Sequence, residues 1–230
     1  MSVQTADYLD AVTHLPHGGR LTFYDVGWDD YEQLLAQLDD RAHLRISYNQ
    51  GRLEIMSPSA KHEKYKNLLH DLVMILSDEL EQEVVSFGSA TLRIQPRGPG
   101  AEGDDCFYIR HNSAIAGRDR LDLMSDPPPD LVVEIDFTHE SSGKFAIYAA
   151  LKVPEIWHYD GGRWQILRLT GQAYELATFS LAFPMLAAER LAEFVTDSET
   201  RGPYQARRAF REWVRATFRE WVRATKPGTL

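Results

Sequence analysis

The chain has 230 residues, of which 43% are hydrophobic and 26% are charged, and its net charge at pH 7 is −9. This size and composition predict one packed domain with a terminal extension, and the acidic balance argues against broad affinity for nucleic acid. No apolar run is long enough to span a membrane, the N-terminus lacks a signal-peptide pattern, and the single cysteine, Cys106, can form no internal disulfide, so we expect a cytoplasmic protein.

The first part of the chain predicts a short helix, a hairpin and a long helix. Apolar residues recur at helical spacing in both helical segments, and two short strand-like runs flank a turn-forming pair. The predicted ranges are 28–38 for the short helix, 44–49 and 52–56 for the hairpin around Gln50-Gly51, and 60–82 for the long helix.

Two polar residues, His62 and Glu63, open the long helix, with Ser57 or Ser59 as its candidate N-cap. An acidic side chain near a helix N-terminus is favourable electrostatically, which accounts for Glu63 without any function. His62 is a candidate contact to a phosphate group. On the preceding strand, Glu54 belongs to a partly exposed arginine–glutamate face.

Acidic residues inside apolar strands are the most informative pattern. Strands are predicted near 84–87, 90–95, 104–109 and 130–136. Asp104 opens the third of these runs, and Glu134 and Asp136 close the fourth. Because a buried carboxylate must be paired, hydrogen-bonded or bound to a metal, these residues indicate a site.

Strand spacing limits which of these carboxylates can share an ion. Asp136 shares a face with Glu134 at about 6.6 Å along the strand, and Asp130 lies roughly 13 Å from Glu134. A partner on an adjacent strand would be roughly 5 Å away, and Asp104 is the obvious candidate. The alternative is that Asp104 and Asp130 are strand-entry residues after turns.

A helix predicted over residues 144–151 places Lys144 and Tyr148 on one face, four positions apart. Lys144 is either part of a site or a solvated lysine in the first turn. Tyr148 either contacts substrate or packs beneath the lysine. Strands predicted at 155–159, 163–169 and 173–179 complete a mixed α/β sheet with helices on its faces.

The C-terminal residues 201–230 form a basic segment with a net charge of +6, against −15 for residues 1–200. The octapeptide Phe210–Thr217 is repeated at once as Phe218–Thr225, and its apolar residues predict an amphipathic helix. We therefore divide the chain into a domain over 1–200 and a helical extension over 201–230. The helix either packs on its own domain or on a second subunit, binds phosphate, or lies on a membrane surface.

Several of these stretches together resemble the Uma-two family of restriction endonucleases, which belongs to the PD-(D/E)xK nuclease superfamily. The resemblance runs from about residue 20 to about residue 195, with the motifs in the same order and spacing. The stretches that carry it are Gly51–Pro58 followed by His62-Glu63, Ala101–Ile109, Pro129–Asp136, Lys144–Ala149 and Val153–Trp157.

The resemblance implies a restriction-endonuclease-like core with Asp104, Glu134 and Lys144 as catalytic residues. Asp104 and Glu134 would bind Mg²⁺, with Mn²⁺ as a substitute. The superfamily lysine commonly follows the glutamate by two residues, where this chain has Asp136, and Lys144 matches the variants in which the lysine has moved to the next helix. A second departure is Gly103, where a proline is expected.

The resemblance also implies secondary roles and a reaction. Glu63 matches an acidic residue on the first helix that approaches the metal, and His62, Asp136 and Tyr148 are accessory candidates. We expect a Mg²⁺-dependent endonuclease acting on DNA as a homodimer, because two-fold symmetry suits cleavage of both strands. The alternatives are a catalytically inactive nuclease-fold protein that binds nucleic acid or a protein partner, and an unrelated module with structural ion pairs.

Overall fold

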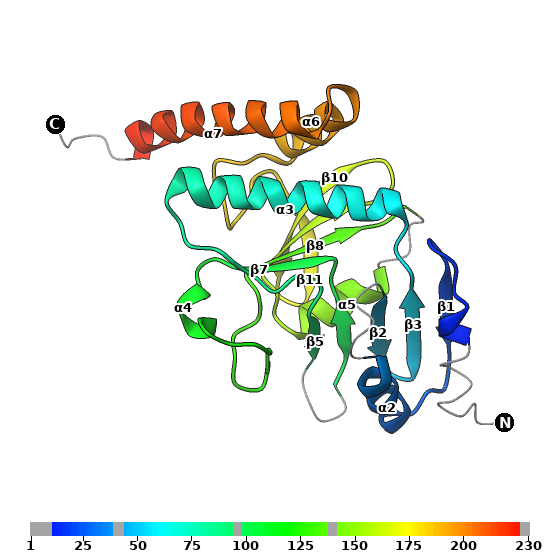
Figure 1. Ribbon diagram of the computed structural model, residues 1–230. Coiled ribbons are helices and arrows are strands. Elements are labelled where there is room, and N and C mark those ends of the chain that lie inside the picture. The colour runs from blue at the N-terminus through cyan, green and yellow to red at the C-terminus, as the bar shows by residue number, and fades with distance from the viewer. Residues whose placement is uncertain (1–10, 39–43, 94–97, 138–141, 226–230) are drawn as a thin grey trace.

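The computed structural model describes residues 11–38, 44–93, 98–137 and 142–225 (Figure 1). The helices are α2 (Trp28–Leu38), α3 (Ala60–Leu80), α4 (Asn112–Ile115), α5 (Ser142–Ala150), α6 (Ala188–Thr200) and α7 (Pro203–Thr225). The strands are β1 (Arg20–Phe23), β2 (Arg45–Asn49), β3 (Arg52–Met56), β4 (Val85–Ser86), β5 (Thr91–Arg93), β6 (Gly100–Glu102), β7 (Asp105–Tyr108), β8 (Leu131–Ile135), β9 (Glu155–Tyr159), β10 (Trp164–Thr170) and β11 (Ala173–Ala177).

Within the described residues, the strands form two sheets. One has five strands in the order β1-β3-β2-β6-β5, and the other has six in the order β11-β10-β9-β8-β7-β4. The strand pairs are antiparallel except β8 with β9, which are parallel. The mixed α/β class with flanking helices is therefore confirmed, whereas the division into two sheets was not predicted.

The predicted hairpin has the backbone that its turn residues favour. Gln50 and Gly51 both adopt positive φ, 48° and 85°, and Asn49 pairs with Arg52. A two-residue turn with positive φ at both positions matches the twist of the flanking strands, and glycine accommodates that conformation without strain. The turn fixes the register of β2 and β3 and therefore which side chains face the site.

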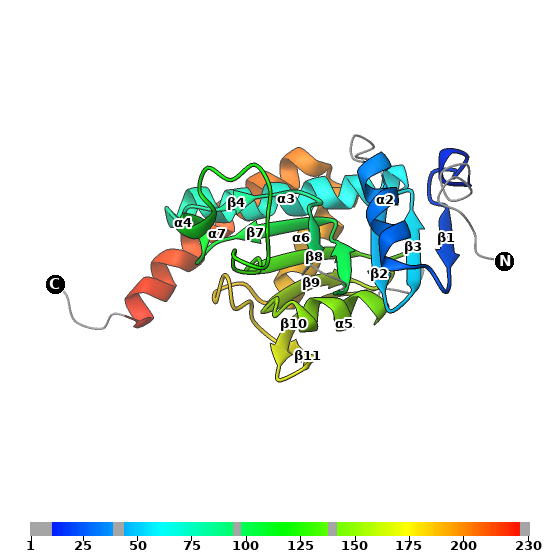
Figure 2. The same cartoon turned by 90° about the horizontal axis from the view of Figure 1, so that it is seen from below.

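Alternation along β8 divides the core into two layers. Leu131 and Val133 pack with Leu72 of α3 on one face of the six-stranded sheet, whereas Val132 packs with Ile147 of α5 on the other. Figures 1 and 2 show α3 and α5 on opposite sides of this sheet. Glu134 is two residues after Val132, so alternation directs it towards α5.

The chain passes from one sheet to the other at Gly103 and Asp104. These two residues separate β6, in the five-stranded sheet, from β7, in the six-stranded sheet. Asp104 donates its backbone N–H to the carbonyl of Val133, so it extends the β7–β8 pairing by one residue. The register continued in this way sets Asp104 opposite Glu134.

The C-terminal helix α7 packs on the domain through the first copy of the octapeptide. Phe210 and Val214 are fully buried in the same core as α3, and the ring of Phe210 meets Phe194 of α6 edge to face at 4.9 Å. This outcome matches the alternative in which the helix packs on its own domain. No helix in the described residues, α7 included, is both long and apolar enough to cross a membrane.

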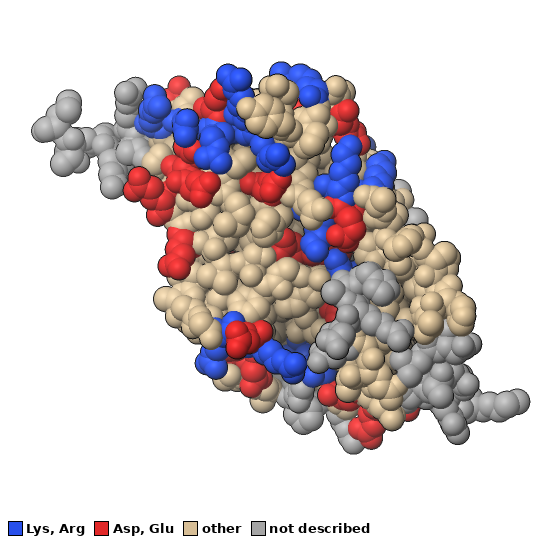
Figure 3. Space-filling model, in the orientation of Figure 1, with Lys and Arg blue, Asp and Glu red and all other residues tan. Residues whose placement is uncertain are grey.

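Ion pairs to α3 neutralise much of the positive charge of α7. Arg207 pairs with Asp71, and both Arg211 and Arg215 reach Glu79, the latter at 2.6 Å. Figure 3 shows the basic side chains gathered along the top of the molecule with acidic ones directly beneath them. These arginines therefore serve first to dock the helix, which weakens the interpretation of α7 as a phosphate-binding element.

Candidate active site

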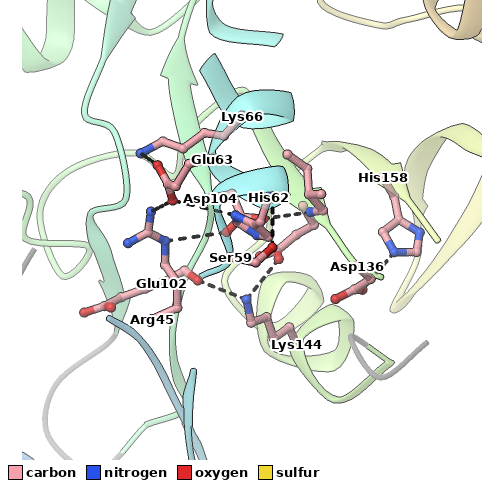
Figure 4. Close-up of polar contacts among 12 residues, drawn as sticks. Arg45, Ser59, His62, Glu63, Lys66, Glu102, Asp104, Asp136, Lys144 and His158 are labelled. Atoms are coloured by element: carbon pink, nitrogen blue, oxygen red, sulfur yellow. Dashed lines mark hydrogen bonds and ion pairs between the residues drawn. The ribbon is translucent and has the colours of Figure 1, made fainter. Parts of the chain in front are cut away.

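The three residues predicted to be catalytic meet at the junction of the two sheets. Glu134 lies in β8. Asp104 stands at the crossover, and Lys144 reaches in from the first turns of α5 (Figure 4). The Asp104 and Glu134 side chains are each 1% exposed, and that of Lys144 is 16% exposed. The alternative of a solvated Lys144 is therefore wrong, because its ammonium group is held in the protein.

Asp104 is fixed by its backbone surroundings as well as by charge. Its Oδ2 accepts a hydrogen bond from the backbone N–H of Ile135 at 2.7 Å and lies 3.0 Å from Nε2 of His62. Its Oδ1 lies 3.5 Å from Nε of Arg45 and accepts no hydrogen bond from any described residue. One buried carboxylate oxygen is thus left available to a further ligand.

Glu134 is held by two donors from α5. Lys144 Nζ lies 2.9 Å from Oε2 of Glu134, and the hydroxyl of Tyr148 donates to Oε1. The same ammonium group donates to the backbone carbonyl of Glu102 at 3.2 Å. Tyr148 is fully buried, so it packs beneath the lysine and holds Glu134 through its hydroxyl.

Burial and charge shift the pKa values of the three groups differently. Burial, together with the nearby Asp104 and Asp136 carboxylates, raises the pKa of Glu134 to about 7 although Lys144 opposes the shift. Burial disfavours the charged form of Lys144, but Glu134 and Asp104 outweigh it and raise the lysine pKa. Burial likewise opposes ionisation of Asp104, yet His62, Lys144 and Arg45 hold its pKa below the usual value.

A basic pair, Arg45 and His62, lies against Asp104. Arg45 is nearly fully buried and also lies 3.4 Å from Oε1 of Glu63. Burial lowers the pKa of His62, but Asp104 and Glu63 more than compensate and raise it. The structure therefore brings His62 and Glu63 close to Asp104. His62 contacts it directly, and Glu63, which is 41% exposed, is one ion pair removed.

Sequence reasoning missed Arg45. It opens the strand Arg45–Asn49, where a basic residue at a strand end is ordinarily solvent-exposed. Its role depends on the pairing of β2 with β6, because that pairing brings it close to the crossover after β6. No local signal in the sequence links Arg45 to Asp104.

The remaining acidic candidates have different partners. Asp136 lies 3.0 Å from Nε2 of His158, and both residues are buried. Asp130 accepts hydrogen bonds from the backbone N–H groups of Ile109, Arg110 and His111. Asp130 therefore closes a turn, as its strand-entry alternative predicted, whereas Asp136 remains beside the site.

Gly103 has little room for a side chain. A Cβ atom built on it would lie 3.0 Å from Cγ1 of Val132 and 3.4 Å from the hydroxyl oxygen of Tyr148. The glycine found where the resemblance expects a proline is thus part of the packing that holds Tyr148 against Glu134.

The donor set suits a hard divalent cation. Within the described residues, no group of three or more His, Cys, Asp or Glu side chains is arranged to hold a metal. Asp104 and Glu134 nevertheless provide two carboxylates, one of them with the oxygen that accepts no hydrogen bond. Mg²⁺ is usually bound through one or two carboxylates and keeps several waters, so these two residues fit it.

Comparison with known proteins gives one family and a distant structural likeness. The model of the Uma2 family, described as "Putative restriction endonuclease", matches residues 28–197. A crystal structure described as a putative nuclease from Anabaena variabilis is 14% identical, with a TM-score of 0.46, over 84% of this chain and 98% of that one. A search of the curated proteins finds no match.

Proposed function

Because the chain belongs to the Uma2 family, we propose that it is a metal-dependent endonuclease that hydrolyses phosphodiester bonds of DNA. The observation that carries the proposal is the contact between Lys144 and Glu134, 2.9 Å, at the crossover that presents Asp104. It places an ammonium group and two carboxylates in one buried cluster, although the chain has Asp136 where the lysine commonly stands.

In this proposal Asp104 and Glu134 hold Mg²⁺, with Mn²⁺ as a substitute. When bound, the ion would polarise the phosphate and lower the pKa of a bound water. Glu134 can serve as a ligand only when ionised, and its pKa of about 7 makes occupancy depend on pH near neutrality. Tyr148 and Lys144 hold its two oxygens in place through hydrogen bonds from α5.

Lys144 acts as a fixed positive charge. In the metal-free chain Glu134 and Asp104 raise its pKa, which favours the protonated ammonium group. Held between Glu134 and the carbonyl of Glu102, it is positioned to donate a hydrogen bond to negative charge that develops on the phosphate. Preorganised donors of this kind contribute strongly to catalysis because they need no reorganisation during the reaction.

His62 and Arg45 complete the electrostatics around Asp104. Their positive charges keep this carboxylate ionised in a buried position. Both are placed to reduce the repulsion that a polyanionic substrate would meet at two carboxylates. Glu63, more exposed, orients Arg45 through their ion pair.

The test is nicking of supercoiled plasmid by the purified chain with Mg²⁺ or Mn²⁺. Glu134→Ala and Lys144→Ala should both abolish cleavage, whereas the matched surface changes Glu175→Ala and Lys64→Ala should leave it intact. Cleavage that survives Glu134→Ala would contradict the assigned site. No cleavage by the unmodified chain with either metal would favour a catalytically inactive nuclease-fold protein that binds nucleic acid or a protein partner.

A further inference from the structure

We propose that the pocket beside the catalytic cluster holds one unpaired nucleobase, so that the preferred substrate is single-stranded or locally opened. This inference rests on the proposed nuclease function and names its substrate class. It draws on a cavity that the catalytic roles of Asp104, Glu134 and Lys144 do not use.

The pocket has a volume of about 390 Å³ and lies where β1, the loop before α3 and the end of β8 meet. A much smaller hollow, lined in part by Lys144 and Arg45, adjoins it. The two share Arg20, Met56 and Asp136 as lining residues. A strand whose phosphate lies at Lys144 can therefore place a neighbouring group in the larger pocket.

The lining suits a planar base together with the phosphate attached to it. Met56, Pro58, Ile135 and Phe137 provide apolar surface for the base, while hydroxyl groups, the carboxylate of Asp136 and the basic side chains of Arg20 and His62 provide polar contacts. A base has two apolar faces that stack on such surfaces and an edge that forms hydrogen bonds. Asp136, which also lies 3.0 Å from Nε2 of His158, can accept a hydrogen bond from an exocyclic amino group of the base.

Phe137 provides an aromatic ring in the lining of the pocket, and neighbouring side chains hold it in place. Its ring lies 5.6 Å from that of Tyr65 and 5.4 Å from that of Tyr159, centroid to centroid. Nζ of Lys61 lies 4.8 Å from the same ring. A preorganised aromatic ring beside an ammonium group is the combination that binds unpaired nucleotides, the ring through the base and the charge through the backbone.

A base can enter this pocket only after it leaves its stack. Unstacking costs least in a single strand or at a mismatch, whereas a paired base must also break its hydrogen bonds. The volume lies within the range of about 300–1,000 Å³ that is typical of small-molecule sites. The site therefore favours unpaired nucleotides over nucleotides in a base-paired duplex.

The first experiment measures binding without cleavage. Fluorescence anisotropy with Ca²⁺ in place of Mg²⁺ compares a labelled single-stranded DNA oligonucleotide with the same sequence as a duplex. The single strand should bind more tightly, and Phe137→Ala should weaken its binding by about 5- to 150-fold. The control Phe179→Ala removes a ring that is 50% exposed and does not line the pocket, and should change nothing.

A second variant, Thr22→Trp, fills the pocket from β1 and does not depend on the packing around Phe137. It should also weaken single-strand binding, while calorimetry shows unchanged Mn²⁺ affinity. Equal binding of duplex and single strand, or unaltered affinity in both variants, would overturn the base pocket. In that case plasmid nicking would still support the nuclease proposal. Selective binding of the single strand without nicking would support the base pocket and contradict the nuclease proposal.

Discussion

Replacing Lys144 with methionine should destabilise the metal-free protein only at alkaline pH. Nζ of Lys144 lies 2.9 Å from Glu134, whose side chain is 1% exposed. Two unit charges at this distance attract by about 6 kcal/mol at an effective dielectric constant of about 20. Methionine keeps most of the aliphatic stem but leaves Glu134 without its counter-charge.

Protonation of Glu134 limits how much stability the Lys144→Met variant loses. In the folded state the pKa of Glu134 is raised to about 7, so protonation of this group stabilises the fold. That contribution is fully present below the ordinary pKa of a glutamate and is lost as the pH rises through 7. Without the lysine the pKa of Glu134 rises further. The Lys144→Met variant therefore continues to lose stability above pH 7, where the unmodified protein no longer does. The added loss is at most about 1.4 kcal/mol per pH unit, which gives about 1.4 kcal/mol at pH 8 and about 2.7 kcal/mol at pH 9.

Urea denaturation at pH 6, 8 and 9 in the presence of a chelator measures this loss. Lys144→Met should match the unmodified protein closely at pH 6 and diverge above pH 7. The double variant Glu134→Gln with Lys144→Met should show no such divergence. A loss of the same size at all three pH values, or a pH dependence that persists in the double variant, would refute the proposed coupling of these two groups.

Three further predictions concern metal affinity, the pH dependence of cleavage and the packing of α7. Mg²⁺ affinity, measured by calorimetry, should rise up to tenfold per pH unit below pH 7 and level off above it, because the ion competes with the proton on Glu134. An affinity that does not change with pH would contradict the assignment of Glu134 as a ligand. Tyr148→Phe removes the hydroxyl that favours the ionised Glu134, so the pH midpoint of cleavage should move upwards, and an unmoved midpoint would exclude this positioning role. Phe210→Ala should lower the free energy of unfolding by about 3–5 kcal/mol, and the equivalent Phe218→Ala in the second octapeptide by much less; equal losses in urea denaturation would show that both copies dock alike.

Local patterns in the sequence predict most of the elements around the site. The helical stripe that begins after Ser59 and the turn pair Gln50-Gly51 both appear where expected, because each is determined by residues within a few positions. Residues 188–200 were assigned no element, although Leu191, Phe194 and Val195 recur at helical spacing and are buried in α6. That helix was therefore predictable and was missed.

Other features depend on pairing between distant segments. The strand Gly100–Glu102 has three residues and no apolar alternation, so nothing in it predicts a place beside β2. The crossover at Asp104 arises because β6 and β7 pair in different sheets. Arg45 joins the site only through that arrangement, which is why the sequence predicted the carboxylates and the lysine but not the arginine.

The tight packing at Gly103 has a consequence for how such proteins can diverge. A side chain at this position would press on Val132, whose Cγ1 lies 3.0 Å from the place a Cβ would take, whereas the Tyr148 hydroxyl, at 3.4 Å, is at ordinary contact distance. Positions 103 and 132 should therefore substitute together: chains with proline at the position of Gly103 should have a smaller residue at the position of Val132. We therefore expect correlated substitutions at these two positions among related chains.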